Sequence, residues 1–357
     1  MFYYLLVGLV TGGFALAAMQ LREYRYLFMF PLFVLTAYFV GFRDISIGTD
    51  TLRYSEIYFD IQPLSNALAI GNFGFEAQRI EAGFVLLASV FREFDAGFQH
   101  FLFFLNFLTV SVIFYSYQRI DKNIAPILVF LYTCTFTYFT LQYNIVRQGV
   151  AVAFCTLAFC YLLQNRRWPF LVLTLLGASF HSISILFLVV WPVRKFRWHP
   201  GYALVFIPLS IGVASVDFLQ ELTSLLSPYS VTVYRVANYM LTQAGEINLL
   251  SLSVVLDFLL IVYCIVDSKF LTKQSDYFNP VLTAFVIGFL GMLALHELKL
   301  LSLRYYYLFC PFEVITFYMA LHRFTGRYLV KEVIVVSLGF LWLLKNVYVT
   351  AQFITSY

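Results

Sequence analysis

Long apolar runs dominate the hydrophobic pattern of this chain, and short polar segments separate them. A helix that crosses a bilayer needs about 20 apolar residues, or about 17 at the short end. Runs near that length occupy 2–20, 25–41, 98–118, 124–141, 148–164, 201–216, 249–267, 278–296, 305–322 and 328–349. The pattern predicts an all-α integral membrane protein, a polytopic helical bundle of about 11–12 transmembrane helices.

Two further apolar segments do not fit a single ordinary span. Residues 168–193 are too long for one span and too short for two, and basic clusters flank them at 166–167 and 194–197. This favours a tight hairpin or re-entrant pair with both ends on one side of the membrane. Residues 82–93 are apolar but short, which predicts a short interfacial or re-entrant helix on the outer side.

The distribution of lysine and arginine predicts the orientation, because short cytoplasmic loops are enriched in them. If Arg22 and Arg25 are cytoplasmic, 14 of the 23 basic residues fall in six short inner loops. Both termini and the long polar segments 42–97 and 217–248 then lie outside. The second of these segments is amphipathic and rich in tyrosine, which predicts a lid over the outer mouth.

Composition supports a membrane protein and excludes other classes. The chain has 357 residues, of which 61% are hydrophobic and 12% charged, whereas soluble domains carry roughly 25% charged residues. The net charge of +4 is small and spread along the chain, so nothing indicates a nucleic-acid partner. The five cysteines fall in apolar stretches without metal-ligand spacing, so no metal site is expected. With no linker, low-complexity run or clean repeat, residues 1–357 are predicted to form one membrane domain.

The first candidate site is residues 41–54, GFRDISIGTDTLRY, where the second predicted span leaves the membrane. Arg43 and Arg53 could bind an anion, because a guanidinium binds phosphate oxygens in pairs. Asp44 and Asp50 could orient these arginines or bind sugar hydroxyls, and Tyr54 could contact a sugar. The alternative is a capped interfacial loop, in which Thr49 or Asp50 caps the next helix.

The second candidate is residues 144–149, NIVRQG, which open a predicted helix on the outer side. Arg147 is unfavourable at a helix N-terminus, whose dipole attracts anions. We therefore expect Arg147 to have an anionic partner, either a phosphate of a substrate or the carboxylate of Asp44 or Asp50. The neighbouring Gln148 is a candidate substrate ligand.

The third candidate is His181, in the sequence FHS at the midpoint of 168–193. An ionisable side chain within a membrane segment is usually functional, and an imidazole titrates near neutral pH. His181 is therefore a candidate general base, with Asp50 as its competitor. The alternative is a packing residue that is hydrogen-bonded to Ser179 or Ser182.

A fourth group combines Arg304 with Tyr305 and the two tyrosines that follow. Tyrosine rings stack on sugars, and Arg304 could reach a phosphate. An interfacial belt of aromatic and basic residues is the alternative.

These motifs in this order resemble the EpsG/Wzy-type polysaccharide polymerases of bacteria. The features that match are Arg43-Asp44, Gly48-Thr49-Asp50 and Tyr54, then EAGF at 81–84, IVRQG at 145–149 and FHS at 180–182. The resemblance extends from the first span to about residue 325.

The resemblance implies a GT-C-like fold in the bacterial inner membrane, with the active site facing the periplasm. Such an enzyme would join oligosaccharide repeat units carried on undecaprenyl pyrophosphate and release undecaprenyl pyrophosphate. No cofactor, metal or nucleotide sugar is expected. The implied partners are undecaprenyl-pyrophosphate-linked oligosaccharides, the lipid bilayer and a chain-length-regulating co-polymerase.

Three alternatives remain at this point. A lipid-linked oligosaccharide flippase or other transporter should show paired half-repeats and charge along a whole path, whereas charge here gathers on the outer face. A membrane acyltransferase that uses His181 would need this residue accessible from the cytoplasm. A non-catalytic assembly partner of such enzymes is the third.

Overall fold

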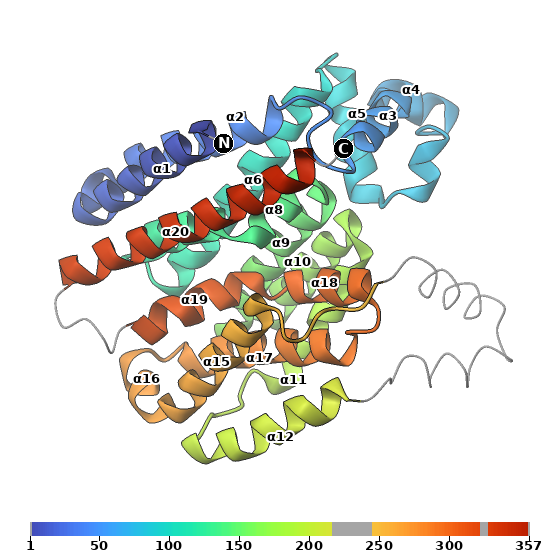
Figure 1. The fold of residues 1–357 in the computed structure, drawn as a ribbon. Helices are drawn as coiled ribbons and strands as arrows, with labels where there is room; N and C mark the ends of the chain where they lie inside the picture. The colour runs from blue at the N-terminus through green and yellow to red at the C-terminus, as the bar shows by residue number, and fades with distance from the viewer. Residues whose placement is uncertain (1, 216–244, 322–327, 356–357) are drawn as a thin grey trace, which may run out of the picture. The chain divides into compact units, whose positions relative to one another are not determined.

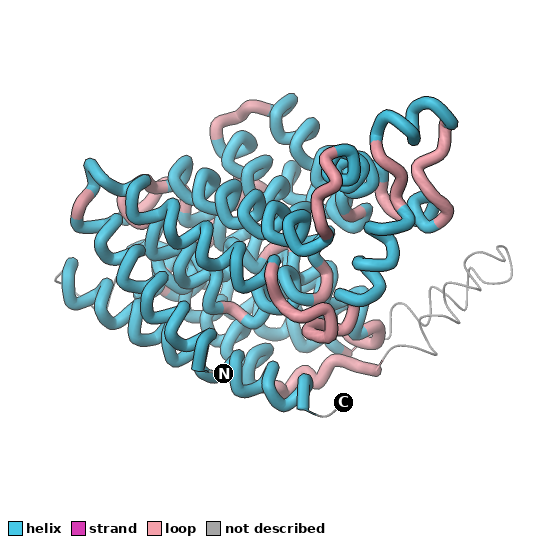
Figure 2. Tube along the Cα trace, turned by 90° about the horizontal axis from the view of Figure 1, so that it is seen from above, coloured by secondary structure: helices cyan, strands magenta, loops and turns pink. Residues whose placement is uncertain are grey.

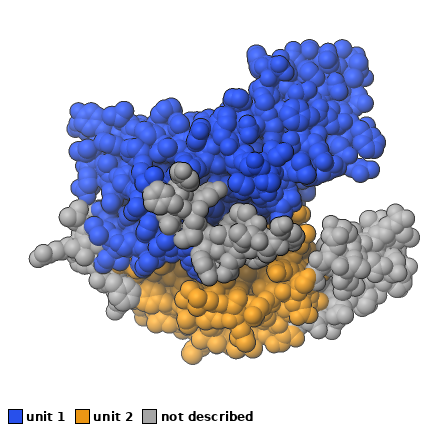
Figure 3. Space-filling model, turned by 45° about the horizontal axis from the view of Figure 1, so that its top comes forward, with its two compact units in different colours: residues 1–188, 324–357 blue, residues 189–323 orange. Residues whose placement is uncertain are grey.

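The computed structural model describes residues 2–215, 245–321 and 328–355. The described part is helical throughout, with connecting turns and loops (Figures 1 and 2). This confirms the predicted all-α class. The chain divides into two compact units, residues 1–188 with 324–357 and residues 189–323, which Figure 3 distinguishes by colour. The prediction of one continuous membrane domain stays a prediction, and each unit is described by itself.

Unit 1 contains most of the helices. They are α1 (Phe2–Gln20), η1 (Arg22–Tyr24), α2 (Arg25–Gly41), α3 (Thr51–Asp60), α4 (Leu64–Ile70), η2 (Glu76–Arg79), α5 (Ala82–Glu93), α6 (Phe98–Ile120), α7 (Ala125–Cys134), α8 (Phe136–Tyr143), α9 (Val146–Leu163), α10 (Arg167–Phe180), η3 (Ser182–Val189, whose last residue belongs to unit 2) and α20 (Tyr328–Thr355). Helix α6 packs on α2, α7 and α9, while α1 lies beside α2, α7 and α20 (Figure 1).

Three helices of the described part are long and apolar enough to cross a membrane: Arg22–Gly41, Phe98–Ile120 and Val146–Leu163. A fourth crossing is possible if α7 and α8 form one bent span. The remaining predicted spans correspond mainly to shorter apolar helices. The structure thus supports a helical membrane protein, but its described helices provide fewer full-length spans than the 11–12 that the sequence predicts.

The predicted span 124–141 is wrong as a continuous helix. Helices α7 and α8 meet at a 71° bend. Thr135 lies between them with an extended backbone, and its Oγ1 accepts a hydrogen bond from Tyr138 N at 3.0 Å. A threonine that caps a new helix in this way satisfies its first N–H groups and so stabilises the break. Likewise the predicted span 305–322 is interrupted between α18 and α19, where Pro311 occupies the start of α19.

The segment 42–97 is helical rather than an open loop, because its helices have apolar faces that need burial. Tyr54, Ile57, Tyr58 and Ile61 recur at helical spacing along and just beyond α3, and all are buried. They join Phe84 of α5 and residues of α6, α9 and α10 in one hydrophobic cluster. This cluster fixes the segment 42–97 to the helices of unit 1 that carry the other motifs.

Helices α2 and α6 approach so closely that Gly41 has no room for a side chain. A Cβ there would lie 2.5 Å from Cα of Phe103. We expect Gly41→Ala to push the two helices apart, and overpacking of this kind costs about 1–3 kcal/mol. The measurement is the midpoint of thermal unfolding in detergent, followed with a dye that reacts with buried cysteines such as Cys155 and Cys160 once they are exposed.

The matched control for Gly41 is Gly13 in α1, where an added Cβ meets nothing within 4 Å. Gly13→Ala should leave the midpoint unchanged or raise it, since alanine favours a helix over glycine by up to about 1 kcal/mol. Equal midpoints for the two variants would contradict the close contact between α2 and α6.

Unit 2 contains α11 (Val190–Val193), η4 (Pro200–Tyr202), α12 (Ala203–Ala214), α15 (Leu252–Val266), α16 (Ser268–Gln274), α17 (Phe278–Ala294), α18 (Lys299–Tyr307) and α19 (Cys310–Ala320). Helix α17 packs on α12, α15, α18 and α19. Asp257 of α15 and Glu313 of α19 both lie within hydrogen-bond distance of the Tyr306 hydroxyl, at 2.8 and 3.0 Å. Most of the predicted lid, 217–248, lies outside the described residues.

Candidate active site

The loop that follows α2 is anchored by Arg43, whose side chain is buried. The guanidinium donates to the carbonyl oxygens of Val40 and Ile47, at 2.6 and 3.2 Å. It also donates to Oγ1 of Thr51 and to the carbonyl oxygen of Tyr143, both at 3.0 Å. Arg43 thus fixes its own loop to the end of α8, a positioning role. A direct contact between Arg43 and pyrophosphate stays a prediction from the sequence.

Two further contacts hold this loop against the junction of α8 and α9. The backbone N–H of Thr49 donates to Oδ1 of Asn144 at 2.9 Å. Gly48 has a φ of +94°, and a Cβ there would lie 2.2 Å from the carbonyl oxygen of Tyr143. Only glycine adopts such a conformation without strain and allows so close a backbone approach. The first motif is therefore held beside the second.

The two aspartates of the first motif have different local roles. Asp44 is exposed, and its Oδ1 accepts hydrogen bonds from the hydroxyl and backbone N–H of Ser46 at 2.7 and 2.8 Å. These bonds lower the pKa of Asp44 below its ordinary value. Asp50 occupies the N-cap position of α3, but its carboxylate accepts from the Thr49 hydroxyl at 3.2 Å and not from the helix N–H groups. The capping bond from Asp50, which the sequence left open as an alternative, is thus not formed.

Arg147, at the start of α9, forms an ion pair with Glu81. Glu81 immediately precedes α5, and its other oxygen, Oε1, accepts from the backbone N–H of Ser182 at 3.1 Å. Nε of Arg147 lies 3.4 Å from the hydroxyl of Tyr54, on α3. The sequence offered Asp44 or Asp50 as the carboxylate partner of Arg147. The structure instead selects Glu81 as the ion-pair partner, while Asp50 is near enough to interact electrostatically.

These contacts bring together residues from four separate sequence motifs. Tyr54 comes from the first motif, Glu81 from the EAGF motif, Arg147 from the helix-opening motif and Ser182 from the FHS motif. All four lie in unit 1. The side chains of Arg147 and Glu81 remain 19% and 21% exposed, so a ligand can reach the ion pair.

A close approach of α5 and α10 allows Glu81 to contact Ser182. A Cβ on Gly83 would lie 2.3 Å from Oγ and 2.8 Å from the carbonyl oxygen of Ser179. The aromatic ring of Phe84, next along α5, packs edge-on against Phe101 with ring centroids 5.3 Å apart. The EAGF motif thus supplies the carboxylate, the small residue for close packing and the hydrophobic anchor.

His181 directly follows α10, which ends at Phe180. The helix therefore breaks within 168–193, as the length of that segment predicted. The backbone of His181 is extended, with φ −155° and ψ 116°, and its side chain is buried. The neighbouring N–H of Ser182 is the one that contacts Glu81. The structure therefore brings the FHS turn to the Arg147 site. The roles of His181 and Asp50 as general bases stay predictions.

The other predicted ligands are Arg53, Gln148, Arg304 and Tyr305, and they lie in different environments. Arg53 is exposed and pairs with Glu56 at 3.0 Å and Glu76 at 2.5 Å, which raises the pKa of Arg53. Gln148 is fully buried beside Arg147. Arg304 and Tyr305 belong to α18 of unit 2. A role for them at the unit 1 site stays a prediction.

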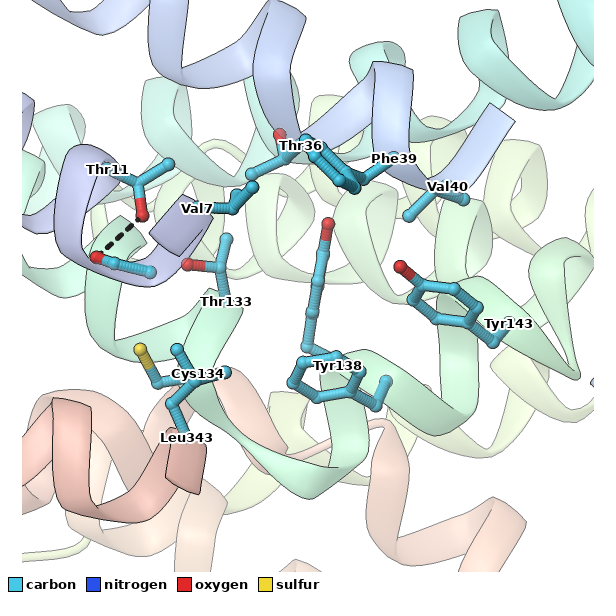
Figure 4. Close-up of a pocket in the computed structure, with 12 residues that line it drawn as sticks. Val7, Thr11, Thr36, Phe39, Val40, Thr133, Cys134, Tyr138, Tyr143 and Leu343 are labelled. Carbon is cyan, nitrogen blue, oxygen red and sulfur yellow. Dashed lines mark hydrogen bonds between the residues drawn. The ribbon is translucent and has the colours of Figure 1, made fainter. Parts of the chain in front are cut away.

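Unit 1 contains a small hollow that shares Tyr143 with the anchor of the loop. It is lined by residues of α1, α2, α7, α8 and α20, and its lining includes no charged residue. In Figure 4 the hydroxyls of Tyr138 and Tyr143 point into it. Tyr143, whose carbonyl accepts a hydrogen bond from Arg43, belongs both to this hollow and to the anchor of the loop.

Comparison with known protein families decides the family. A family model described as the EpsG family matches residues 26–357, nearly the whole chain. The chain belongs to the EpsG family. The comparisons with curated proteins and with solved structures find no match. Membership of the EpsG family indicates a multi-pass membrane protein of the polysaccharide-polymerase type of glycosyltransferase.

Glu81 is the residue of the EpsG site that the sequence analysis did not select. It appeared there within the EAGF motif, with no role of its own. One signal was available: a carboxylate directly before a short apolar helix lies where the helix dipole favours negative charge. That signal does not reveal its partner, because Arg147 is 66 residues away in the chain.

Proposed function

We propose that this protein joins oligosaccharide repeat units that are linked to undecaprenyl pyrophosphate. In the reaction, the growing chain is transferred from its lipid pyrophosphate to a sugar hydroxyl of the next lipid-linked unit. Undecaprenyl pyrophosphate is the leaving group. The reaction takes place on the periplasmic face of the bacterial inner membrane. The observation that carries the proposal is the convergence of the four motifs on the ion pair of Arg147 and Glu81.

The chemistry of the reaction matches this centre. Breaking the bond between the anomeric carbon and the pyrophosphate increases the negative charge on the leaving oxygen. A cation that is already positioned there stabilises the transition state more than the ground state. Arg147 is partly exposed and has several donors in a planar fork suited to phosphate oxygens. The energy for transfer resides in the glycosyl–pyrophosphate bond, so the reaction needs no nucleotide sugar.

The remaining predicted site residues receive supporting roles. Tyr54 contacts Arg147 and orients it, and Gln148 lies buried next to it. Asp44 and Arg53 are exposed, so they could bind sugar hydroxyls or phosphate. Arg304 and Tyr305, on α18 of unit 2, are proposed to bind a phosphate and a sugar ring. Asp50 and His181 are the proton acceptors that the sequence favours.

The rival functions make different demands on the same residues. A flippase needs charged residues along a path through the membrane, whereas the ion pair lies at the start of α9 and directly before α5. An acyltransferase needs His181 to attack an acyl donor from the cytoplasm. An assembly partner needs no cation poised for a leaving group. The partly exposed Arg147 favours transfer from a phosphate-linked donor.

The test is to incubate the purified protein with a defined undecaprenyl-pyrophosphate-linked repeat unit. We expect a ladder of oligomers and the release of undecaprenyl pyrophosphate. A flippase would move the labelled lipid between leaflets of a vesicle without forming a ladder, and an acyltransferase would leave the sugars unjoined. Absence of a ladder from folded protein in a lipid nanodisc would refute the proposed function.

A further inference from the structure

The carboxylate of Glu81 connects Arg147, at the start of α9, to Ser182, which follows α10. Its Oε2 pairs with Arg147, and its Oε1 accepts from the backbone N–H of Ser182. The pair is neither fully buried nor fully exposed, since about a fifth of each side chain is accessible. Glu81 therefore occupies, on Arg147, the position that an anionic ligand would take.

We propose that the pyrophosphate of the donor displaces Glu81 from Arg147, and that the displaced carboxylate then accepts the proton of the attacking sugar hydroxyl. This inference rests on the proposed function and assigns a catalytic role to a residue for which the sequence analysis gave none. It makes the ion pair a resting state, which the substrate opens.

The exchange is favourable because of the charges involved. A pyrophosphate diester carries more negative charge than one carboxylate, and its several oxygens match the guanidinium fork. Arg147 keeps its contact with Tyr54 through Nε during the exchange. Glu81 keeps its hydrogen bond to Ser182 through Oε1, so the carboxylate stays beside the leaving group. A carboxylate that loses its cation partner is a stronger proton acceptor.

The proposed step balances as follows. The acceptor hydroxyl oxygen forms a bond to the anomeric carbon of the donor, while its proton passes to Oε2 of Glu81. The bond between the anomeric carbon and the pyrophosphate oxygen breaks, and its electron pair stays on that oxygen, beside Arg147. After undecaprenyl pyrophosphate leaves, Glu81 releases the proton to water and pairs with Arg147 again.

The structure favours Glu81 over the other two candidates for this role. Glu81 is hydrogen-bonded directly to Arg147, where the leaving group is expected, and its side chain is 21% exposed. His181, in contrast, is a buried residue. The carboxylate of Asp50 contacts the hydroxyl of Thr49, in the anchored loop.

The test compares Glu81→Gln with Glu93→Gln in the full-length protein in lipid nanodiscs. Glu93 ends the same helix, α5, and its carboxylate accepts from Ser65, so it controls for loss of a carboxylate on that helix. Binding of undecaprenyl pyrophosphate and the turnover of a lipid-linked repeat unit are both measured. Glu81→Gln should bind at least as tightly as the wild type, because a competing anion is removed. Its turnover should fall about 100- to 10,000-fold.

Two results would overturn the assignment of Glu81. The first is turnover of Glu81→Gln within tenfold of the wild type. The second is a loss of binding that accounts for the whole loss of turnover, which would show a structural role. If Glu81→Gln does not fold, Glu81→Asp tests the assignment instead, because it keeps the negative charge. For Glu81→Asp we expect a lower kcat with unchanged KM. A raised KM with unchanged kcat would overturn the proposal.

These outcomes are separable from failure of the proposed function. If the wild-type protein makes no oligomer ladder, the polymerase function itself is refuted. If the wild type makes the ladder and Glu81→Gln also makes it at a similar rate, only the role of Glu81 is refuted.

Discussion

Replacement of Arg147 with alanine is expected to slow polymerisation by about 30- to 1000-fold, which corresponds to roughly 2–4 kcal/mol of lost transition-state stabilisation. Arg147 is the cation that we propose for stabilising the leaving pyrophosphate, and it contacts Tyr54 and Glu81. Arg147→Lys keeps the positive charge but loses the planar fork, so it should restore activity only in part.

The measurement is the rate of ladder formation by purified variants at equal protein concentration. Arg79→Ala is the control for removal of an arginine elsewhere in unit 1, because Arg79 is exposed in the 42–97 segment and packs on the ring of Phe75. We expect this control to retain wild-type activity. Normal polymerisation by Arg147→Ala would eliminate the pyrophosphate-binding role of this residue.

Replacement of Arg43 with alanine is expected to remove activity by a different route, through loss of structure. Its buried guanidinium donates to the carbonyl oxygens of Val40, Ile47 and Tyr143 and to the hydroxyl of Thr51. A hydrogen bond to a charged group contributes about 1.5–3 kcal/mol to the free energy of unfolding, and the contributions of several bonds to one group do not simply add. We expect Arg43→Ala to lower the free energy of unfolding by about 3–4 kcal/mol.

Arg43→Lys should rescue little of this stability, because one ammonium group cannot reach carbonyl oxygens on three sides. Thermal unfolding in detergent and the rate of ladder formation are measured together for each variant. Arg147→Ala should lose activity with a small change in unfolding midpoint, whereas Arg43→Ala should lose both. If Arg43→Ala lost activity and kept its midpoint, Arg43 would act on the substrate, as the sequence alone suggested.

Arg43 and Arg147 show what a sequence pattern can and cannot predict about a side chain. In the sequence each is an arginine beside polar residues and near a predicted helix end, and each is predicted to lie on the outer side of the membrane. The structure separates them: the guanidinium of Arg43 is buried against backbone oxygens, and that of Arg147 is partly exposed beside a carboxylate. Burial depends on which helices pack around a residue, and neighbouring residues in the sequence do not specify this.

Of two breaks in the helices, the sequence predicted one and the structure alone revealed the other. The interruption at His181 was expected because 168–193 has the wrong length for one or two spans, and α10 does end at Phe180. The 71° bend at Thr135 was not expected, because the apolar run 124–141 has a suitable length for one span. The single threonine that caps α8 has too little weight in a hydrophobicity pattern to predict a bend.

The sequence by itself determined the helical membrane class and the family, because long apolar runs and short motifs are local properties of the chain. The sequence motifs also contained the residues that meet at the candidate site, but they indicated no role for Glu81. Only the tertiary structure decided that Glu81 pairs with Arg147 and reaches Ser182. An ion pair depends on distance in space, and here that distance is fixed by the packing of Phe84 on Phe101 and the contact of Gly83 with Ser179.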